Sequence, residues 1–207
     1  MNFLKRIMIF LVFLGVLSCS SEHKQAPVNA LDINSGDAEQ LANNLYQTKS
    51  STFRTAIKNN ASDSLHVFFD YLGPTVQIAT LGSGLIRFQF GIYLRAQNQC
   101  NLLYVMLHID TPNSIEVERK SNPGMSTHEE CANNGYTTLK PSLTHALPHD
   151  ITAGNGVDFD TQIDSNVLSV FIDGTLVWQG DIPEDTAGEN TSAGIRSDNV
   201  NIAFILL

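Results

Sequence analysis

Apolar and polar residues alternate one by one over several stretches in the second half of the sequence. This period of two is typical of strands whose faces differ, because successive side chains of an extended chain point to opposite sides. The pattern runs through residues 86–95 and 103–110, and it is clearest in residues 167–178. There Asp173-Gly174 interrupts it, and an Asp-Gly pair suits the positive φ angles of a tight turn. The pattern therefore predicts a β-hairpin.

Short strands joined by turn residues indicate an antiparallel β-sandwich, which we place at residues 63–207. About 140 residues are enough to enclose one hydrophobic core. No internal repeat divides the chain further. We therefore predict a mainly β protein with a single folded domain.

The residues before the sandwich do not show the same alternation. Asp37 followed three residues later by Gln40 matches a capping box, and leucines follow one helical turn apart. We therefore predict a short helical segment at residues 37–62, broken near residues 49–51. Residues 19–36 are polar and without pattern, which favours a flexible tether.

The first residues read as a positive charge followed by an apolar run. Lys5 and Arg6 precede residues 7–17, which are almost entirely apolar. A membrane-spanning helix needs roughly 20 apolar residues, so this run is too short to cross a bilayer. We therefore predict a cleaved signal peptide at residues 1–18.

The end of that segment, Val16-Leu17-Ser18-Cys19, resembles the bacterial lipobox. The resemblance implies that Cys19 receives a diacylglycerol and an acyl chain such as palmitate. Two or more acyl chains anchor a protein stably. Ser20 after the cysteine favours the outer membrane, with the folded part facing the periplasm or the cell surface. The alternative is an ordinary signal peptide with an incidental cysteine.

Cys100 and Cys131 remain as an even pair once Cys19 is assigned to the lipid. Disulfides persist outside the cytoplasm, so export favours a bond between them. A bond closing a loop of this size contributes about 3–4 kcal/mol in the chain-entropy model. Two reduced, buried thiols are the alternative.

The charge balance argues against one class of partner. The chain has 12 Lys and Arg against 21 Asp and Glu, for a net charge of −9. Without Lys5 and Arg6 of the signal peptide, 10 basic residues face 21 acidic ones, or −11. A chain this acidic repels the phosphate groups of nucleic acids, and we therefore expect no nucleic-acid partner.

The predicted hairpin also carries a family resemblance. Its residues 170–174, Val-Phe-Ile-Asp-Gly, followed by Val-Trp at 177–178, resemble a hairpin of concanavalin A-like lectin/glucanase domains of the LamG-like type. Residues 193–199, Ala-Gly-Ile-Arg-Ser-Asp-Asn, are similar to the last strand of those domains. The resemblance covers residues 75–207 and implies a jelly-roll sandwich. It implies little about activity, because this fold hosts lectins, glycosidases and lyases.

Polar side chains of the predicted strands form a candidate ligand site. If the strands pair as they do in that family, planar and charged groups share one sheet face, as in a groove that binds sugars or peptides. An ordinary solvated sheet face is the alternative. Trp178 adds either a stacking platform for a sugar ring or a core side chain. The candidates are Arg87, Gln89, Tyr93, Arg95, Tyr104, His108, Glu116, Glu118 and Trp178.

Glu116 and Glu118 point to the same side of one predicted strand, as the two carboxylates of a glycosidase must. Laminarinase-type members of the family carry E-x-D-x-x-E at such a strand. Here Ser121 stands in place of the final acid. We therefore expect no enzymatic activity and assign no catalytic residue.

Clustered acidic residues later in the chain are weak candidates for calcium. Asp158, Asp160 and Asp164 supply the oxygen ligands that hard cations prefer. Alternation alone also places Asp158 and Asp160 on the outer side of a strand. We expect no other cofactor.

Three functions are compatible with these features. The first is a membrane-anchored envelope lipoprotein whose sandwich binds carbohydrate, an envelope glycan, or another envelope protein without catalysis. The second is a structural subunit of an outer-membrane assembly such as a secretion system, and the third is a glycoside hydrolase. A lectin is expected to show a solvent-exposed aromatic side chain over a groove, whereas a subunit exposes an apolar patch larger than ~400 Å² or an unpaired sheet edge.

Overall fold

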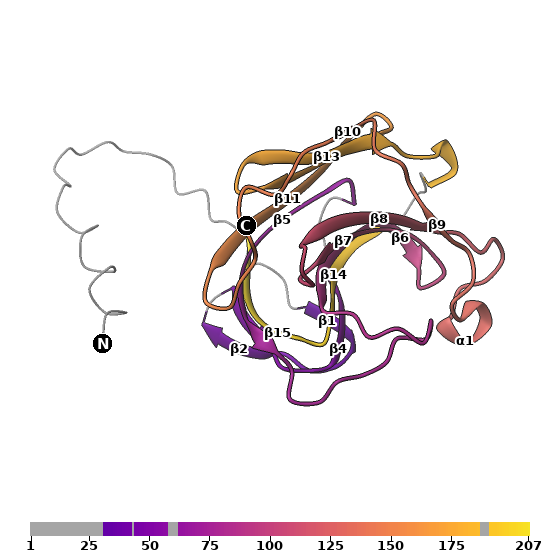
Figure 1. Cartoon of the computed structure of the whole chain (residues 1–207). Helices are drawn as coiled ribbons and strands as arrows, with labels where there is room; N and C mark the ends of the chain where they lie inside the picture. Colours follow the sequence, from indigo (N-terminus) through magenta and orange to yellow (C-terminus); the bar gives the residue numbers. More distant parts are fainter. Residues whose placement is uncertain (1–30, 43, 58–61, 187–190) are drawn as a thin grey trace, which may run out of the picture.

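The computed structural model describes residues 31–42, 44–57, 62–186 and 191–207. Within these residues two antiparallel sheets pack face to face as a sandwich (Figure 1). This confirms the predicted mainly β architecture. In order, the seven-stranded sheet consists of β1 (Leu31–Ser35), β4 (Thr52–Ile57), β14 (Ser192–Asp198), β6 (Gln89–Asn98), β7 (Asn101–His108), β8 (Ser114–Lys120) and β9 (Tyr136–Thr138).

The second sheet has eight strands and carries both the predicted hairpin and the last strand of the chain. In order, it consists of β10 (Leu143–Thr144), β13 (Thr175–Asp181), β12 (Val167–Ile172), β11 (Gly156–Asp164), β5 (Ser64–Pro74), β15 (Val200–Leu206), β3 (Leu45–Thr48) and β2 (Glu39–Ala42). The turn between β12 and β13 has Asp173 at φ 49° and Gly174 at φ 72°. The predicted Asp-Gly hairpin is therefore confirmed.

The core lies between the two sheets and is rich in phenylalanine. Phe53, Phe69, Phe90, Phe159 and Phe204 are buried, and they come from both sheets. The rings of Phe69 and Phe90 lie 4.4 Å apart between centroids. Burying one such side chain contributes about 1.5–3 kcal/mol, so these contacts hold the sheets together.

The helix predicted at residues 37–62 is wrong wherever the structure describes that segment. Its described residues form β2, β3 and β4, and buried and half-buried residues alternate along β4. Phe53 and Ile57 face the core together with the buried Thr55 between them. Because Thr55 is polar but faces the core, the apolar residues of this strand do not alternate regularly in the sequence. Residues 58–61 lie outside the described residues.

The N-terminal boundaries also need correction. Residues 31–35, predicted as part of a tether, form β1, which pairs with β4 at the edge of the seven-stranded sheet. The sandwich therefore includes strands before residue 63, from β1 (Leu31–Ser35) onward among the described residues. The predicted signal peptide, Cys19 and the rest of the tether lie outside the described residues and stay predictions.

Helical structure is limited to two short turns in the described part of the chain. These are α1 (His128–Cys131) and the 3-10 turn η2 (Glu184–Thr186). Among the described residues, no helix has the length and apolar character needed to cross a membrane. Figure 1 shows α1 beside the hollow side of the seven-stranded sheet, which curves away from its partner sheet.

Candidate functional site

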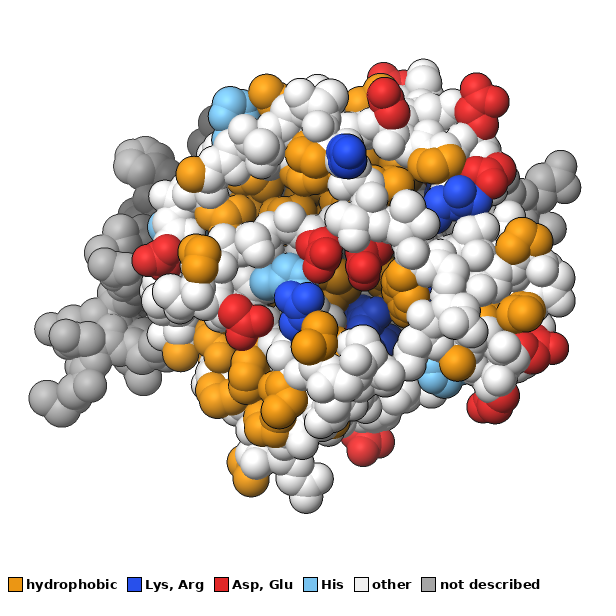
Figure 2. Space-filling view, turned by 45° about the vertical axis from the view of Figure 1, so that its right-hand side comes forward, with side chains coloured by type: hydrophobic (Ala, Val, Ile, Leu, Met, Phe, Trp, Pro, Cys, Tyr) orange, Lys and Arg blue, Asp and Glu red, His pale blue; other side chains and the backbone are white. Residues whose placement is uncertain are grey.

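A groove of about 820 Å³ lies on the outer face of the seven-stranded sheet. Side chains from β1, β4, β14, β6, β7 and β8 form its floor, while residues 80–87 and the segment around α1 form its walls. Figure 2 looks onto this face, where basic, acidic and histidine side chains gather around a hollow. The groove combines opposite charges with tyrosine rings.

The pairing of the strands places the polar side chains in adjacent rows across the sheet. Arg54 of β4 is paired with Arg196 of β14, and Asp198 is paired with Gln89 of β6. Tyr104 of β7 is paired with Glu118 of β8. The site therefore depends on contacts between strands that are far apart in the sequence.

Two glycines let large side chains lie flat on the floor. A Cβ on Gly91 would overlap the sulfur of Met106, and a Cβ on Gly194 would overlap the ring of Tyr93. With no side chain at either position, Met106 and Tyr93 cross the neighbouring strand closely. Together with Tyr104 they form a small apolar cluster on this face.

A buried carboxylate joins two arginines at the centre of the floor. Asp198 has no exposed surface, and it accepts hydrogen bonds from Arg54 at 2.6 Å and Arg196 at 2.9 Å. Gln89 donates a third at 2.6 Å. Burial alone would raise the pKa of Asp198, but the two guanidinium groups outweigh it and hold that pKa below its usual range.

The guanidinium of Arg196 also covers an aromatic ring. Its central carbon lies 4.8 Å from the ring centroid of Tyr104, which is a cation–π contact. Lys120 lies 5.1 Å from the ring centroid of Tyr136 in the same way. The rings of Tyr104 and Tyr136 stack at 6.2 Å. Tyr136 is half-buried, so it is the more accessible of these two rings.

Histidine and glutamate side chains form the side of the groove along β8. His108 Nε2 and Glu116 Oε2 are 2.8 Å apart. The other ring nitrogen of His108 is buried and has no hydrogen-bond partner among the described residues. Burial and the nearby charge of Glu116 raise the pKa of Glu118, whereas Arg196 and Arg87 oppose that rise.

A long loop between β5 and β6, residues 75–88, forms one wall. The side chain of Asn199 ties both ends of this loop together, because it bonds the Ala79 backbone at 2.7 and 2.8 Å and the Arg87 carbonyl at 2.9 Å. At the tip of the loop, Gly82 approaches Asn133 so closely that a Cβ would overlap the Asn133 amide. The loop therefore reaches the segment around α1.

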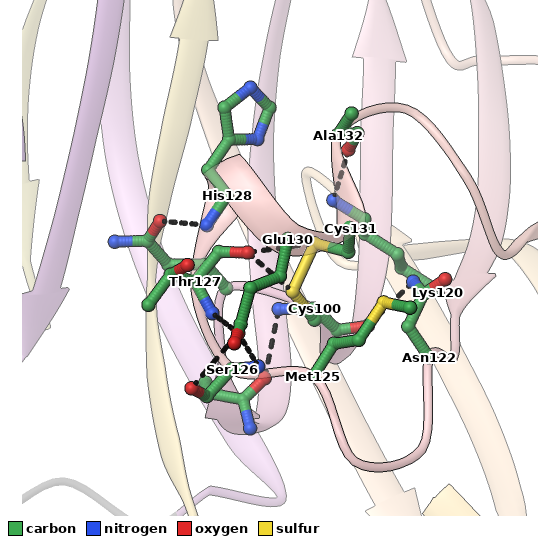
Figure 3. Close-up of a disulfide and its surroundings, with 12 residues drawn as sticks. Cys100, Lys120, Asn122, Met125, Ser126, Thr127, His128, Glu130, Cys131 and Ala132 are labelled. Carbon is green, nitrogen blue, oxygen red and sulfur yellow. Dashed lines mark hydrogen bonds between the residues drawn. A yellow bond between two sulfur atoms is a disulfide. The ribbon is translucent and has the colours of Figure 1, made fainter.

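The wall around α1 is fixed by covalent and polar contacts (Figure 3). The disulfide between Cys100 and Cys131 is present, which confirms the predicted pairing. Glu130 Oε2 accepts hydrogen bonds from the backbone N–H groups of Ser126 at 2.7 Å and Thr127 at 2.9 Å. These bonds hold the pKa of Glu130 below its usual range. His128 and Glu129 line the groove from this wall.

Most of the candidate residues predicted from the sequence meet in this groove, although their role in binding stays a prediction. Two of the nine lie elsewhere, namely Arg95 and Trp178. The seven that line the groove are Arg87, Gln89, Tyr93, Tyr104, His108, Glu116 and Glu118.

Arg95 was placed on the groove face by simple alternation, and this placement is wrong. The strand is irregular after Leu94, and Arg95 has a φ of 48°. Its side chain bonds Asp63 at 2.6 Å instead. A bulge inserts an extra residue and reverses the alternation, so the side chain leaves the face.

Trp178 as a stacking platform for a sugar is also wrong. The residue belongs to β13 of the eight-stranded sheet, is 3% exposed and packs in the core between the sheets. Five further residues of the site were not predicted from the sequence: Arg54, Arg196, Lys120 and Tyr136, which line the groove, and Asp198, which binds both arginines. Arg196 and Asp198 alternate along one strand, which is a signal that the sequence does contain.

The calcium candidates Asp158, Asp160 and Asp164 all lie on strand β11 of the other sheet. Asp158 contacts His66 at 2.6 Å, Asp160 accepts a hydrogen bond from Gln162 at 2.7 Å, and Asp164 accepts one from Ser165 at 3.3 Å. In the described ranges, no group of three or more His, Cys, Asp or Glu side chains is arranged to hold a metal ion. The geometry gives the calcium hypothesis no support.

The sequence matches no protein-family model and no curated protein. By shape, it is similar to the carbohydrate binding module CBM66 from Bacillus subtilis, with a TM-score of 0.58 at 10% identity over 84% of this chain and 91% of that chain. The exoplasmic/lumenal domain of VIP36, in its form bound to Ca²⁺ and Man3GlcNAc, matches with a TM-score of 0.50 at 12% identity over 86% and 83%. A β-fructofuranosidase of Aspergillus kawachii, complexed with glycerol, matches with a TM-score of 0.46 at 15% identity over 83% and 27%.

Identities this low define the fold and nothing finer. The chain has a β-sandwich fold like that of lectins and carbohydrate-binding modules, which confirms the predicted antiparallel sandwich and is consistent with the resemblance to concanavalin A-like domains. The groove lies on one outer sheet face of that sandwich.

Proposed function

We propose that this protein is a non-catalytic module that binds carbohydrate in the groove of the seven-stranded sheet. The observation that carries the proposal is the composition of the groove, in which arginine, glutamate and amide side chains surround tyrosine rings, of which that of Tyr136 is half-buried. Sugars present hydroxyl groups for such polar side chains and C–H faces for aromatic rings. The lectin-like fold supports the same assignment.

The positions of the acidic groups favour binding over hydrolysis. Glu116 is paired with His108 at 2.8 Å, whereas the carboxylate of Glu118 has no hydrogen-bonding or ion-pair partner among the described residues. Ser121, which stands where a third acid would be, accepts a hydrogen bond from Arg119 at 2.9 Å. A glycosidase needs two carboxylates free to act as acid and as base or nucleophile.

The proposal includes a location. The signal-like N-terminus and the lipobox resemblance at Cys19 support a lipoprotein of the bacterial outer membrane. A lipid anchor at that position leaves the sandwich free to bind glycans of the envelope. Metabolic labelling with a palmitate analogue, compared between the wild type and Cys19→Ala, tests this anchor directly.

Docking to another envelope protein is the second candidate function. Apolar side chains around the loop at residues 75–88 are exposed, and Figure 2 shows hydrophobic side chains gathered below the hollow. Exposed apolar patches mark sites of protein association. The exposed residues are Leu72, Val76, Ile78, Leu85 and Ile86.

A glycan array probed with the full chain in detergent tests the first function. We expect the wild type to bind at least one glycan. Glu118→Arg, which puts a larger and oppositely charged side chain into the groove, should abolish that binding. Lys140→Glu is the matched control, because Lys140 is exposed and outside the groove. If the wild type binds no glycan and instead purifies with a stoichiometric protein partner, the docking function replaces this proposal.

A further inference from the structure

Three charged side chains that line the groove lack a hydrogen-bonding partner among the described residues, namely Glu118, Arg87 and the exposed Glu129 of the wall around α1. Glu118 and Arg87 both reach into the groove, yet neither side chain makes a hydrogen bond or an ion pair there. The other charged groups of the floor are engaged: Asp198 holds two arginines, and Glu116 holds His108. The unengaged groups that are partly buried are therefore one acceptor, Glu118, and one donor, Arg87.

These two groups face the same space without touching. The positive charge of Arg87 acts on the carboxylate of Glu118, and it opposes the rise in the pKa of Glu118 that burial causes. Arg87 and Glu118 form no ion pair with each other, so their charged atoms are more than 4.0 Å apart. Because both side chains line the same groove, one ligand bound there can bond to both.

The charge of the groove restricts the ligand that fits there. Four basic and three acidic residues line the groove, and the buried Asp198 beneath its floor is a fourth acid. The formal charge of the site is therefore zero with neutral histidines, whereas the chain carries −9. A uronate or sulfate would bond Arg87 but meet the free carboxylate of Glu118. An amino sugar would bond Glu118 but meet the free guanidinium of Arg87. A neutral pair of hydroxyl groups satisfies both side chains, because a hydroxyl donates and accepts.

We propose that the groove binds a neutral sugar through two adjacent hydroxyl groups, one donating to the carboxylate of Glu118 and the other accepting from the guanidinium of Arg87. This assignment rests on the proposed carbohydrate-binding function and names the ligand class of the same site. Hydrogen bonds to charged groups are among the stronger ones in proteins. The two side chains therefore determine which sugar is bound.

The test is calorimetry with the full chain in detergent and three kinds of probe. The neutral probes are mannan, dextran, galactan and cello-oligosaccharides, the acidic probe is polygalacturonate, and the basic probe is chitosan oligosaccharide. We expect binding to a neutral probe. Glu118→Gln and Arg87→Gln should each weaken it by about tenfold to a hundredfold, as expected for a lost charged hydrogen bond.

Matched controls separate a loss of contact from a loss of fold. Asp160→Asn and Lys140→Gln make the same chemical changes outside the groove and should leave the affinity unchanged. Thermal unfolding should give similar midpoints for all four variants. A deoxy sugar lacking one hydroxyl of the bound pair should compete poorly, whereas the parent sugar competes fully.

The outcomes distinguish this assignment from the proposed function. If a neutral glycan binds the wild type and both groove variants equally, the assignment to Glu118 and Arg87 is overturned but carbohydrate binding stands. Preference for polygalacturonate, strengthened by Glu118→Gln, overturns the neutral ligand class alone. If no probe of any charge binds and no glycan on the array does, both proposals are overturned.

Discussion

The replacement Asp198→Asn is the sharpest test of what holds the groove together. The carboxylate is fully buried and accepts hydrogen bonds from Arg54 at 2.6 Å, Arg196 at 2.9 Å and Gln89 at 2.6 Å. Asparagine keeps the shape of the side chain but removes the charge. Two guanidinium groups, with side chains 24% and 11% exposed, then share the sheet without a counter-charge.

The cost follows from the loss of that counter-charge. Removing one partner of a buried ion pair costs about 3–5 kcal/mol, because the remaining charge stays buried. Arg54 keeps two acceptors, the backbone carbonyls of Phe53 at 2.7 Å and Ser197 at 2.8 Å, which limits the loss on its side. We therefore expect a decrease of about 3–5 kcal/mol in the free energy of unfolding, or roughly 6–20 °C in Tm for a chain of this size.

The pH dependence of this decrease has a definite sign. Arg54 and Arg196 hold the pKa of Asp198 below its usual range despite burial, so the unfolded state binds the proton more readily than the folded state. The stabilisation is therefore fully present above the ordinary aspartate pKa of about 3.9. It is lost as the pH falls through the lower pKa of the folded state. The difference between wild type and variant should be largest near neutral pH and shrink in strong acid.

Urea unfolding followed by tryptophan fluorescence measures this difference at several pH values. Asp160→Asn is the matched control, because Asp160 is half-buried on the other sheet and accepts its hydrogen bond from Gln162. It should change the free energy of unfolding by about 0.5 kcal/mol or less. If Asp198→Asn unfolds at the same urea midpoint as this control at neutral pH, Asp198 is not the counter-ion that the structure indicates.

Three further predictions concern the disulfide, the tryptophan and the pH dependence of binding. Replacing both Cys100 and Cys131 by alanine should lower the free energy of unfolding by about 3–4 kcal/mol in urea titrations, since the bond closes a loop with a sequence separation of 31. Trp178, 3% exposed in the core, should show blue-shifted fluorescence that a glycan does not alter, and a ligand-dependent change would contradict its position. Glycan affinity measured by calorimetry should fall in mild acid. Burial and the charge of Glu116 raise the pKa of Glu118, although Arg196 and Arg87 oppose the rise, so the carboxylate becomes protonated and loses its negative charge in mild acid. An affinity that does not change with pH would contradict the role of the ionised Glu118 carboxylate in binding the glycan.

The sequence predicts those strands whose two faces differ clearly. Residues 167–178 alternate regularly around an Asp-Gly turn, and both the strands and the turn are present. β4 escaped prediction because the buried Thr55 is polar and interrupts its apolar alternation. Its hydroxyl bonds the carbonyl of Asp32 in the neighbouring strand, a contact that appears only after the chain has folded.

The candidate site was predictable in part for a related reason. β6, β7 and β8 follow one another in the sequence and pair in that order, so alternation along each strand was enough to bring their side chains to one face. Arg54 and Asp198 are separated by 144 residues and meet only because β4 pairs with β14. Non-local pairing of this kind leaves no periodic signal. Arg95 shows that alternation within one strand can also fail, because a single bulge after Leu94 turns its side chain off the predicted face.

The groove divides its charged residues into two sets with different roles. The Asp198 network lies at the centre of the floor, where the carboxylate is fully buried and each charge is paired, and it stabilises the sheet. Glu118 and Arg87 are half-buried and form no ion pair within the part of the chain that the structure describes, so the fold gains little from them. An unpaired, partly buried charge costs free energy unless something binds it. Replacing either residue by a neutral one should therefore leave the stability unchanged or raise it while weakening binding, whereas changes in the Asp198 network should reduce both together.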